Sequence, residues 1–404
     1  MLKTIWILHQ YASTPETGMG GRHYYLAREL AKQGHRVYLI AASYTHMLRT
    51  PVRVEKKVTV QDCEGFHFVW IKVPSYAGVR GRGRILNWIR YSWQVLGLHK
   101  EIKEKPDAIM ASSPQPFLFL SAKRLAQRFG ARLIYEVRDI WPRTLIEMGG
   151  LSSRHPLIML MQWFEDQAYK NSDVVISNLP NAVEHMTGRG LDPSKFHWIS
   201  NGYCAEEIQK QRPVTQDVLA KVPKNKFVVG YVGTLGLANS LHYLLDAVGL
   251  LEQKDNIAVV FVGEGPEKDN LARQAQSLGL TNVKFLGSIS KEKVQSMLGL
   301  FDVCYHGCKD LPLYRYGISP NKLPEYLISG KPVINSYSGF FDVVAEANAG
   351  LSANAEDPAS IAEAINKLML MSPQMRSEAG ARGARYAECN LSYRELAAKL
   401  EKLL

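Results

Sequence analysis

Apolar runs of strand length alternate with helical stretches along this chain, and the alternation occurs twice. In the first half, strands are predicted at residues 5–10, 35–42 and 133–137, with helical patterns at residues 24–32 and 157–170. Strands that alternate with helices form βαβ crossovers, which build a parallel sheet with helices on its faces. The first half is therefore predicted to be a Rossmann-like domain.

The alternation resumes after a polar stretch. Residues 204–225 contain Pro213 and Pro223 and lack a clean hydrophobic period, which indicates a linker. A chain of 404 residues exceeds the size at which one core usually keeps growing. We expect an N-terminal domain over residues 1–203 and a second Rossmann-like domain over residues 226–385. The expected class is α/β, with two Rossmann-like domains facing across a cleft that holds the ligand.

The charge of the chain points to an anionic partner. The formal net charge is +11, and 46% of the residues are hydrophobic, as in a soluble globular protein. Nucleic acid, an acidic membrane and a phosphorylated substrate are the candidate partners. No apolar run approaches the roughly 20 residues that span a bilayer. The first residues are expected to form a strand and not a signal peptide.

The five cysteines are scattered, which indicates a reducing compartment without a disulfide framework. Cys304, His306 and Cys308 occupy alternate positions and could be read as a metal site. No second Cys/His pair stands at finger-like spacing, so we expect a buried strand that runs into a loop, and no metal.

Residues 80–93 form a segment that is rich in arginine and aromatic side chains. It combines arginine with tryptophan on a predicted helix, a composition that suits the surface of an anionic bilayer. The alternative is a solvated basic face whose aromatic side chains pack inward. Nucleic acid is the less favoured partner. The candidate membrane or acceptor residues are Arg80, Arg82, Arg84, Trp88, Arg90 and Trp93.

Residues 319–334 form a loop, a helix and a Gly-Lys-Pro turn into an apolar strand. Lys322 and Glu325 are three apart at the predicted helix start, so they share a face. A helix start also favours anions. A cation for phosphate beside an acceptor for sugar hydroxyls suits a nucleotide-sugar site. The alternative is an exposed helical ion pair between the two side chains.

Three strand-to-helix turns are rich in glycine, at residues 18–21, 233–236 and 263–266. Glycine allows the backbone to approach a phosphate closely, although tight turns of this kind need glycine in any case. None of them matches the dinucleotide pattern G-x-G-x-x-G with its downstream acid, and no Walker or G-x-S-x-G motif occurs.

Taken together, these motifs resemble GT-B glycosyltransferases of the retaining family 4 type. The likeness runs from Gly20-Gly21-Arg22-His23 through Asn201-Gly202-Tyr203 and Val262-Gly263-Glu264-Gly265-Pro266 to Glu325-Tyr326-Leu327-Ile328-Ser329-Gly330-Lys331-Pro332. Within the family, Arg138-Asp139-Ile140-Trp141-Pro142 and Ser319-Pro320-Asn321-Lys322-Leu323 are similar to bacterial enzymes of surface-polysaccharide assembly. These include the transferases of N-acetylfucosamine-type amino-deoxysugars.

The resemblance implies how a donor would be held. Family members use no metal and no dinucleotide, and their C-terminal half binds the nucleotide diphosphate sugar. Glu325 would hold the ribose, Lys322 would meet the diphosphate, and Leu286-Gly287 would lie beside the base. The final helix, near residues 386–404, would cross back to the N-terminal domain. The other implied donor-binding positions are Gly20, Gly21, Thr234, Gly236, Asn239, Gly263, Gly265, Ser319 and Asn321.

The chain departs from the family pattern at three places. Gly317 stands where the family has a first glutamate, and Thr234 and Asn239 stand where it has arginine and lysine. Arg138 replaces a histidine before the retained Asp139. The diphosphate charge must then be met elsewhere. Lys322 is the first candidate, and Arg138, Lys309 and Arg315 are further ones. The catalytic candidates are Lys322, Arg138 and Asp139. The alternative for Arg138 is a structural ion pair with Asp139 or Glu136.

The resemblance implies transfer of a sugar, with retention, from a UDP-type donor to a polyprenyl-diphosphate-linked or oligosaccharide acceptor. The donor is expected to be a 6-deoxy or amino sugar, because the altered positions are those that read sugar hydroxyls. The work would be done in the cytoplasm, at the inner face of the cytoplasmic membrane. Two other functions remain open, a nucleotide-sugar 2-epimerase of similar fold and a non-catalytic protein that binds anionic polymers.

Overall fold

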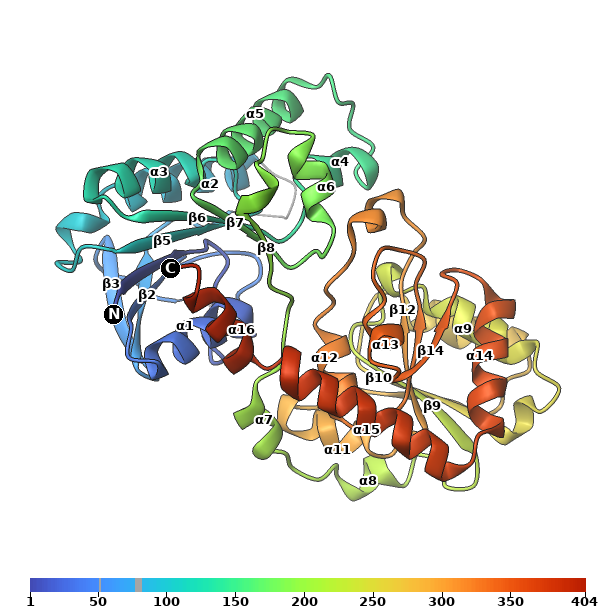
Figure 1. The fold of residues 1–404 in the computed structure, drawn as a ribbon. Coiled ribbons are helices and arrows are strands. Elements are labelled where there is room, and N and C mark those ends of the chain that lie inside the picture. Colours follow the sequence, from blue (N-terminus) through green and yellow to red (C-terminus); the bar gives the residue numbers. More distant parts are fainter. Residues whose placement is uncertain (51, 77–81) are drawn as a thin grey trace. The chain divides into compact units, whose positions relative to one another are not determined.

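The computed structural model describes residues 1–50, 52–76 and 82–404 and divides the chain into two compact units. The first unit contains Met1–Ser200 together with Tyr393–Leu404, and the second contains Asn201–Ser392. Each unit is an α/β domain with its own sheet (Figure 1). The predicted fold class, two Rossmann-like domains, is thereby confirmed.

The first unit is built on an eight-stranded sheet of order β3-β4-β2-β1-β5-β6-β7-β8. All neighbours are parallel except β3 and β4, which form an antiparallel pair at one edge. The strands are β1 (Thr4–Leu8), β2 (Arg36–Ala42), β3 (Val58–Cys63), β4 (Phe66–Ile71), β5 (Ala108–Ser112), β6 (Arg132–Val137), β7 (Val174–Ser177) and β8 (Phe196–Trp198).

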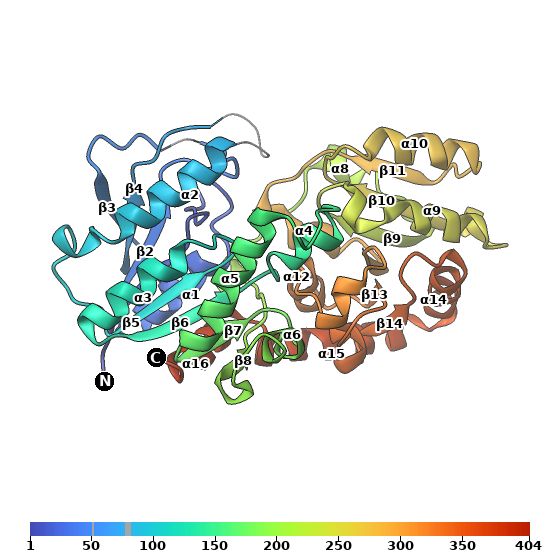
Figure 2. The same ribbon diagram turned by 90° about the horizontal axis from the view of Figure 1, so that it is seen from above.

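Helices cover both faces of this sheet. Helices α2, α3 and α5 lie over one face, whereas α1 and α16 lie over the other (Figures 1 and 2). This distribution is the one expected of crossover connections that run in opposite directions from the central strand. The helices are α1 (Arg22–Lys32), α2 (Arg82–Val95), α3 (Leu118–Phe129), α4 (Arg143–Glu147), α5 (Pro156–Asn171), α6 (Ala182–Thr187) and α16 (Tyr393–Glu401), with 3-10 turns η1 (Leu98–Lys100) and η2 (Pro193–Lys195).

The second unit has a six-stranded parallel sheet of order β11-β10-β9-β12-β13-β14. Its strands are β9 (Phe227–Val232), β10 (Ile257–Val262), β11 (Val283–Leu286), β12 (Val303–Gly307), β13 (Val333–Ser336) and β14 (Gly350–Ala353). The helices are α7 (Ala205–Gln209), α8 (Gln216–Leu219), α9 (Leu241–Gly249), α10 (Lys268–Ser277), α11 (Val294–Leu298), α12 (Lys322–Ile328), α13 (Val343–Glu346), α14 (Pro358–Leu370) and α15 (Pro373–Asn390), with 3-10 turns η3 (Leu237–Asn239), η4 (Lys254–Asn256), η5 (Lys291–Lys293) and η6 (Pro312–Tyr316).

Strand β10 shows why this sheet carries helices on both faces. All six residues of β10 are buried. Val259 and Phe261 pack into one apolar core with α9, α10 and α14, while Val260 and Val262 pack into a second core on the opposite face with α11, α12 and α15. Successive side chains of a strand point to opposite faces, so a strand that is apolar throughout needs cover on both sides.

The last helix belongs to the first unit. The chain leaves the second unit after α15, and α16 packs on α1. The ring of Tyr393 stacks on that of Tyr25 with centroids 5.0 Å apart, and Lys3 Nζ donates to the carbonyl of Leu404 at 2.7 Å. Residues 204–225, expected as a linker, carry the short helices α7 and α8 and pack within the second unit.

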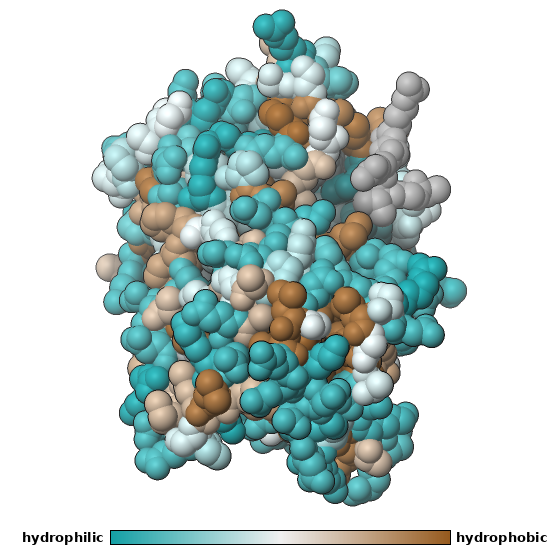
Figure 3. Space-filling model, turned by 90° about the vertical axis from the view of Figure 1, so that its right-hand side faces the viewer, coloured by the Kyte–Doolittle hydropathy of each residue, from teal (hydrophilic) through white to brown (hydrophobic). Residues whose placement is uncertain are grey.

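On the face drawn in Figure 3, hydrophilic residues predominate and hydrophobic residues appear in small patches. Within residues 1–50, 52–76 and 82–404, no helix combines the length and the apolar character that crossing a bilayer requires.

Candidate functional site

The carboxyl ends of the strands in the second unit converge on Lys322. This residue opens α12, directly across from the turn that follows β9. Gly233, in that turn, has a φ of 150°, and a Cβ built on it would lie 2.3 Å from Cε of Lys322. Glycine is therefore required at residue 233, both for its backbone conformation and to leave room for the lysine.

The ammonium group of Lys322 is enclosed but not ion-paired. Its Nζ donates to Asn239 Oδ1 at 2.9 Å and lies 5.2 Å from the centre of the Tyr231 ring. Within the part of the chain that the structure describes, this is the lysine's one hydrogen bond, and no carboxylate lies within ion-pair distance. Burial lowers the pKa of Lys322 to about 8. A half-buried cation without a counter-ion is suited to bind an anion.

Asn239 and Thr234 build the wall beside the lysine. Asn239 Nδ2 donates to the carbonyl of Thr234 at 3.0 Å, and the hydroxyl of Tyr231 donates to the same carbonyl at 2.7 Å. Gly236 begins the η3 turn between them. These bonds fix the Oδ1 of Asn239 as the acceptor that faces Lys322. The structure thus brings the sequence-predicted Thr234, Gly236, Asn239 and Lys322 together.

The glycines of the next turn pack beneath this wall. A Cβ on Gly263 would lie 2.1 Å from the carbonyl oxygen of Gly233, and one on Gly265 would lie 2.2 Å from that of Leu235. Both glycines are thus needed for the two turns to touch. Leu286, buried at the end of β11, and Gly287 follow at the same edge of the sheet.

A buried histidine, His306, completes the surroundings of Lys322. The sequence pattern suggested it only as a metal ligand and not as part of this site. His306, in β12, contacts Asn335 Oδ1 through Nδ1 at 2.7 Å, and Asn335 Nδ2 donates to Asp342 at 2.7 Å. Burial, together with the nearby charge of Lys322, lowers the pKa of His306 to about 4, although the hydrogen bond with Asn335 opposes that shift. His306 is neutral at pH 7. In the described part of the chain, no three His, Cys, Asp or Glu side chains are grouped as metal ligands would be.

Glu325 does not pair with Lys322. Its carboxylate forms an ion pair with Lys291 of the η5 turn, and about a fifth of its side chain is exposed. The two residues share α12 but have different partners, Asn239 for the lysine and Lys291 for the glutamate. The alternative of a helical ion pair between them is therefore excluded, whereas the ribose role of Glu325 stays a prediction.

The loop before α12 is anchored at the start of the second unit. The backbone N–H of Asn201 donates to Ser319 Oγ at 2.8 Å, and Asn201 Nδ2 donates to the carbonyl of Ser319 at 2.6 Å. Gly317 has a φ of 87°, a backbone conformation that a glutamate side chain would strain. Asn321 is exposed and makes no capping hydrogen bond to α12.

In the first unit, the strand ends gather around a fully buried carboxylate. Glu136, in β6, accepts from Arg22 Nε at 2.7 Å and from the hydroxyl of Ser112 at 2.5 Å, and it also contacts His23 Nε2. Burial alone would raise the pKa of Glu136, but His23 and Arg22 outweigh it and hold that pKa well below its usual range. These partners lie far apart in the sequence, so spacing gave no signal for this network.

His9 and Arg138 lie beside that network. The ring of His9 stacks on His23 with centroids 3.9 Å apart, and Arg138 Nη1 lies 3.5 Å from His9 Nε2. Burial lowers the pKa of His9 well below its usual value. Considering the described residues only, Arg138 forms no ion pair with Asp139 or Glu136, and its buried Nε has no partner. The structural ion pair considered for Arg138 is therefore absent, and its guanidinium keeps a donor free.

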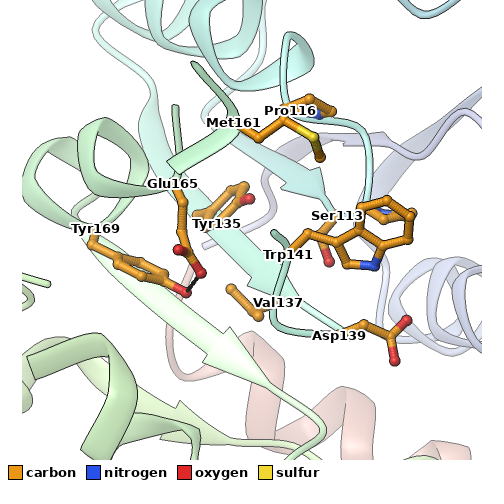
Figure 4. A pocket seen from close by; sticks show the side chains of 10 residues that line it. Ser113, Pro116, Tyr135, Val137, Asp139, Trp141, Met161, Glu165 and Tyr169 are labelled. Atoms are coloured by element: carbon orange, nitrogen blue, oxygen red, sulfur yellow. Dashed lines mark hydrogen bonds between the residues drawn. The ribbon is translucent and has the colours of Figure 1, made fainter. Parts of the chain in front are cut away.

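A small pocket lies between β5, β6 and α5 (Figure 4). Tyr135, Trp141 and Tyr169 supply aromatic walls, and Glu165 accepts from the hydroxyl of Tyr169 at 2.7 Å. His185 and Gln162 also bond Glu165, so this carboxylate is engaged. Asp139 is the exposed carboxylate of the lining. Nearby protein atoms exclude water from part of the Asp139 carboxylate, and this desolvation raises its pKa. The Arg138 guanidinium opposes that shift.

The predicted basic and aromatic segment divides between the surface and the core. Trp93 is 75% exposed and Arg90 is exposed, whereas Trp88 is buried and its indole N–H donates to Tyr11 at 2.6 Å. Arg84 lies over the rings of Tyr11 and Trp88. Arg82 is the first residue of α2, and Arg80 lies outside the described residues.

The glycine-rich turn after β1 leads into α1. Gly20 and Gly21 have φ values of 63° and 83°, so both adopt a conformation that favours glycine. Gly21 caps α1, whose second residue, His23, reaches the Glu136 network. The diphosphate role expected of this turn stays a prediction.

Comparison with known proteins agrees with this architecture. Residues 17–202 match the model of the glycosyl transferase 4-like domain, and residues 216–386 match that of the glycosyl transferases group 1. An Escherichia coli K12 protein provisionally named as the colanic acid biosynthesis glycosyl transferase WcaI is 25% identical over 80% of this chain and 81% of its own length.

Solved structures share the fold over the whole chain. Sucrose-phosphate synthase from Thermosynechococcus elongatus superposes with a TM-score of 0.72 at 16% identity and covers 99% of this chain and 98% of its own. The Anabaena protein HepE in complex with UDP-glucose gives a TM-score of 0.65 at 16% identity over 99% of both chains. The chain is therefore a glycosyltransferase of the GT-B fold, composed of a glycosyl transferase 4-like domain followed by a glycosyl transferases group 1 domain.

Proposed function

We propose that the protein transfers a sugar from a nucleoside diphosphate donor, with UDP as the nucleotide, to a lipid-linked saccharide during the assembly of a surface polysaccharide. The observation that carries the proposal is Lys322, an enclosed ammonium group without a counter-ion at the strand ends of the second unit. A bound diphosphate would supply the negative charge with which this ammonium group can pair. The binding of UDP-glucose by HepE and the name of WcaI support the nucleotide and the class of product.

The reaction is proposed to proceed with retention and without a metal ion. Lys322 would stabilise the charge that develops on the leaving diphosphate, so the protein's contribution is positioning and electrostatics. Glu325 would bind the ribose diol, because a carboxylate accepts two hydrogen bonds from neighbouring hydroxyls. Arg138 and Asp139 of the first unit would act on the acceptor side, where the guanidinium has a free donor.

A donor that lacks ordinary hydroxyls, such as a 6-deoxy or amino sugar of the N-acetylfucosamine kind, is part of the proposal. It rests on Gly317, Thr234 and Asn239, where the resembled family places side chains that contact the donor. The acceptor is proposed to be a polyprenyl-diphosphate-linked sugar at the inner face of the cytoplasmic membrane. Exposed Arg90 and Trp93 on α2 support contact with an anionic membrane.

The test starts with a thermal-shift screen of nucleoside diphosphates, followed by incubation with a panel of UDP sugars and a polyprenyl-diphosphate-linked acceptor, with and without EDTA. We expect UDP to give the largest shift, and a glycosylated lipid of retained anomeric configuration to form in the presence of EDTA. Equal use of UDP-glucose would remove the deoxysugar proposal alone. Epimerisation of the donor without any transfer, or no response to a nucleotide, would contradict the transferase proposal.

A further inference from the structure

Three neighbouring helices of the first unit expose large apolar side chains on their outer surface. Helices α2, α3 and α5 cover the same face of the sheet, and α3 contacts both of the others (Figure 2). Trp93 of α2 and Trp163 of α5 are 75% and 49% exposed. We call this the α2–α3–α5 surface, and its apolar members are Leu86, Ile89, Trp93, Leu120, Met159, Leu160 and Trp163.

Helical spacing explains why these side chains share one outer surface. On α2, Leu86, Ile89 and Trp93 follow one another at intervals of three and four residues, so they lie along one stripe. The opposite stripe of α2 is buried, and there the hydroxyl of Tyr91 donates to the carbonyl of Ile40 at 2.8 Å. The inner face of α2 is thus fixed against the sheet. Because Trp93 lies on the opposite stripe, its side chain points outward.

Helix α5 repeats the arrangement. Met159, Leu160 and Trp163 are exposed at positions i, i+1 and i+4, whereas Met161 and Phe164 on the other side are buried. The ring of Phe164 contacts that of Phe117, which precedes α3, with centroids 5.0 Å apart. Contacts beneath the surface therefore join α5 to α3, and Trp163 packs edge-on against Phe164, with ring centroids 5.1 Å apart, while about half of its own surface stays exposed.

Most of the charged side chains on these three helices are positive. Neither α2 nor α3 contains an aspartate or a glutamate. On α5, Glu165 is buried, and Asp166 is held by Arg189 at 2.7 Å. The cations that α2 and α3 present at or near the surface are Arg84, Arg90, Lys123, Arg124 and Arg128.

We propose that the α2–α3–α5 surface seats the protein on an anionic lipid bilayer, with Trp93 and Trp163 inserted at the level of the headgroups. Single exposed apolar residues are ordinary, but several of them on adjacent helices indicate an interaction surface. Tryptophan and aliphatic side chains suit the boundary between headgroups and acyl chains, and the cations suit anionic lipids. A protein partner gives no reason for the absence of acidic side chains from two adjacent helices.

The proposal extends the membrane contact under "Proposed function", on which it rests, from α2 to α3 and α5. It places Trp88, which the sequence analysis included, inside the protein and outside the lipid contact. Binding to lipid needs neither donor nor acceptor, so the two proposals fail separately. A protein that binds vesicles but no nucleotide would overturn the transferase proposal and leave this surface intact.

The test is flotation of the full-length protein with phosphatidylcholine vesicles, with and without phosphatidylglycerol. Two variants each remove exposed apolar side chains from one helix. Trp93→Ser changes α2, and Met159→Ser/Leu160→Ser/Trp163→Ser changes α5. The matched control is Leu250→Ser/Leu370→Ser, which removes two side chains of the second unit that are 63% and 72% exposed. Thermal unfolding and UDP binding of each variant check that the fold is intact.

We expect the wild type and the control to bind anionic vesicles alike. The α5 variant should bind at least about tenfold more weakly, because three apolar side chains no longer leave water. Unchanged binding by the α5 variant would overturn the proposal. Light scattering provides the second outcome: if the wild type forms a dimer without lipid and the α5 variant is a monomer, a second copy of the chain covers this surface instead.

Discussion

Lys322 is the residue on which the proposed chemistry depends, and its environment sets how it works. The side chain passes over Gly233 and places its ammonium group beside Asn239 and the Tyr231 ring. Neighbouring His306 is neutral at pH 7, since burial lowers its pKa to about 4. Lys322 is thus the cation at this point of the second unit, and its charge is poorly compensated until an anion arrives.

The affinity for UDP should depend on pH through Lys322. Burial lowers the pKa of the free lysine to about 8, and a bound diphosphate raises it again. Well below pH 8 the lysine is charged and exerts its full attraction on the diphosphate. Above pH 8 the free protein loses the proton that the complex needs, so affinity should fall by up to tenfold per pH unit. Calorimetry between pH 6.5 and pH 9.5 measures this.

Lys322→Arg provides the control for the pH dependence. Arginine stays charged over this range, so the variant's affinity should be flat with pH, whatever its absolute value. A wild type that binds UDP equally well at pH 7 and pH 9.5 would show that the lysine does not meet the diphosphate.

Glu325 should act on donor binding more than on turnover. Glu325→Ala removes hydrogen bonds to a charged acceptor, which weakens donor affinity by about 10- to 100-fold. Lys291→Ala breaks the same ion pair but keeps the carboxylate, so it is the matched control and should alter affinity little. A steady-state comparison of KM and kcat separates the two. Equal effects of both variants would mean that the ion pair, and not the ribose contact, matters.

Residue spacing in the sequence indicated part of this site, but not the contacts that depend on the order of strands in the sheets. Lys322 and Glu325 lie three residues apart on a helix, so their shared face follows from helix geometry. His306 and Asn335 meet because β12 and β13 pair in register, and Glu136 meets Arg22 and His23 from 114 and 113 residues away. Contacts of that kind depend on strand order, which spacing along the chain does not reveal.

At the level of elements, Glu136 ties β6 to α1 and β5. The carboxylate is fully buried and binds Arg22, His23 and Ser112. Glu136→Gln leaves a buried arginine without its counter-ion, so we expect a loss of about 3 kcal/mol or more in the free energy of unfolding. Urea unfolding at pH 7 measures it, with the tryptophans of the first unit as the fluorescent probe.

A partly exposed ion pair of the same unit gives the control. Glu147→Gln breaks a pair with Arg143 at 2.6 Å that solvent reaches, and its loss should cost less than about 1 kcal/mol. If the two variants lose the same free energy, the Glu136 network does not hold the elements together.

Elements with strong apolar periodicity were predicted well, and those without it were missed. Strands β2 and β6 start within one residue of the predicted positions and end where predicted, because each is a run of mainly apolar residues. Strand β3 was missed, since it lies at the sheet edge and most of its side chains reach solvent. The helix predicted in the basic and aromatic segment is α2, which ends at Val95 and is followed by the η1 turn.

At the level of the whole molecule, the last twelve residues complete the first unit after the chain has formed the second. Tyr393, Leu396 and Leu400 are buried against α1 and its surroundings. A chain that ends at Ser392 should therefore lose several kcal/mol from the stability of the first unit, on the scale of removing several buried apolar side chains.

Calorimetry of that truncated chain separates the units. We expect the transition of the first unit to shift to lower temperature, while the transition that UDP raises stays in place, since Asn201–Ser392 is intact. Loss of UDP binding in a truncated chain whose second unit is still folded would contradict a donor site built from the second unit.

The division into two Rossmann-like units followed from the repeated alternation of strands and helices, and the structure confirms it. The polar stretch over residues 204–225 suggested a linker from its prolines, but Ile208, Val214 and Val218 pack on the second core. A few apolar residues are enough to bind such a segment to a domain.

The most direct test of the account is the UDP affinity of the wild type and of Lys322→Ala, measured by isothermal titration at pH 7. We expect saturable binding of one UDP per chain, and a loss of affinity of at least about tenfold when the ammonium group is removed, the scale of one charge-assisted contact to a phosphate. Equal affinity of the two proteins, or no binding of UDP by the wild type, would contradict it.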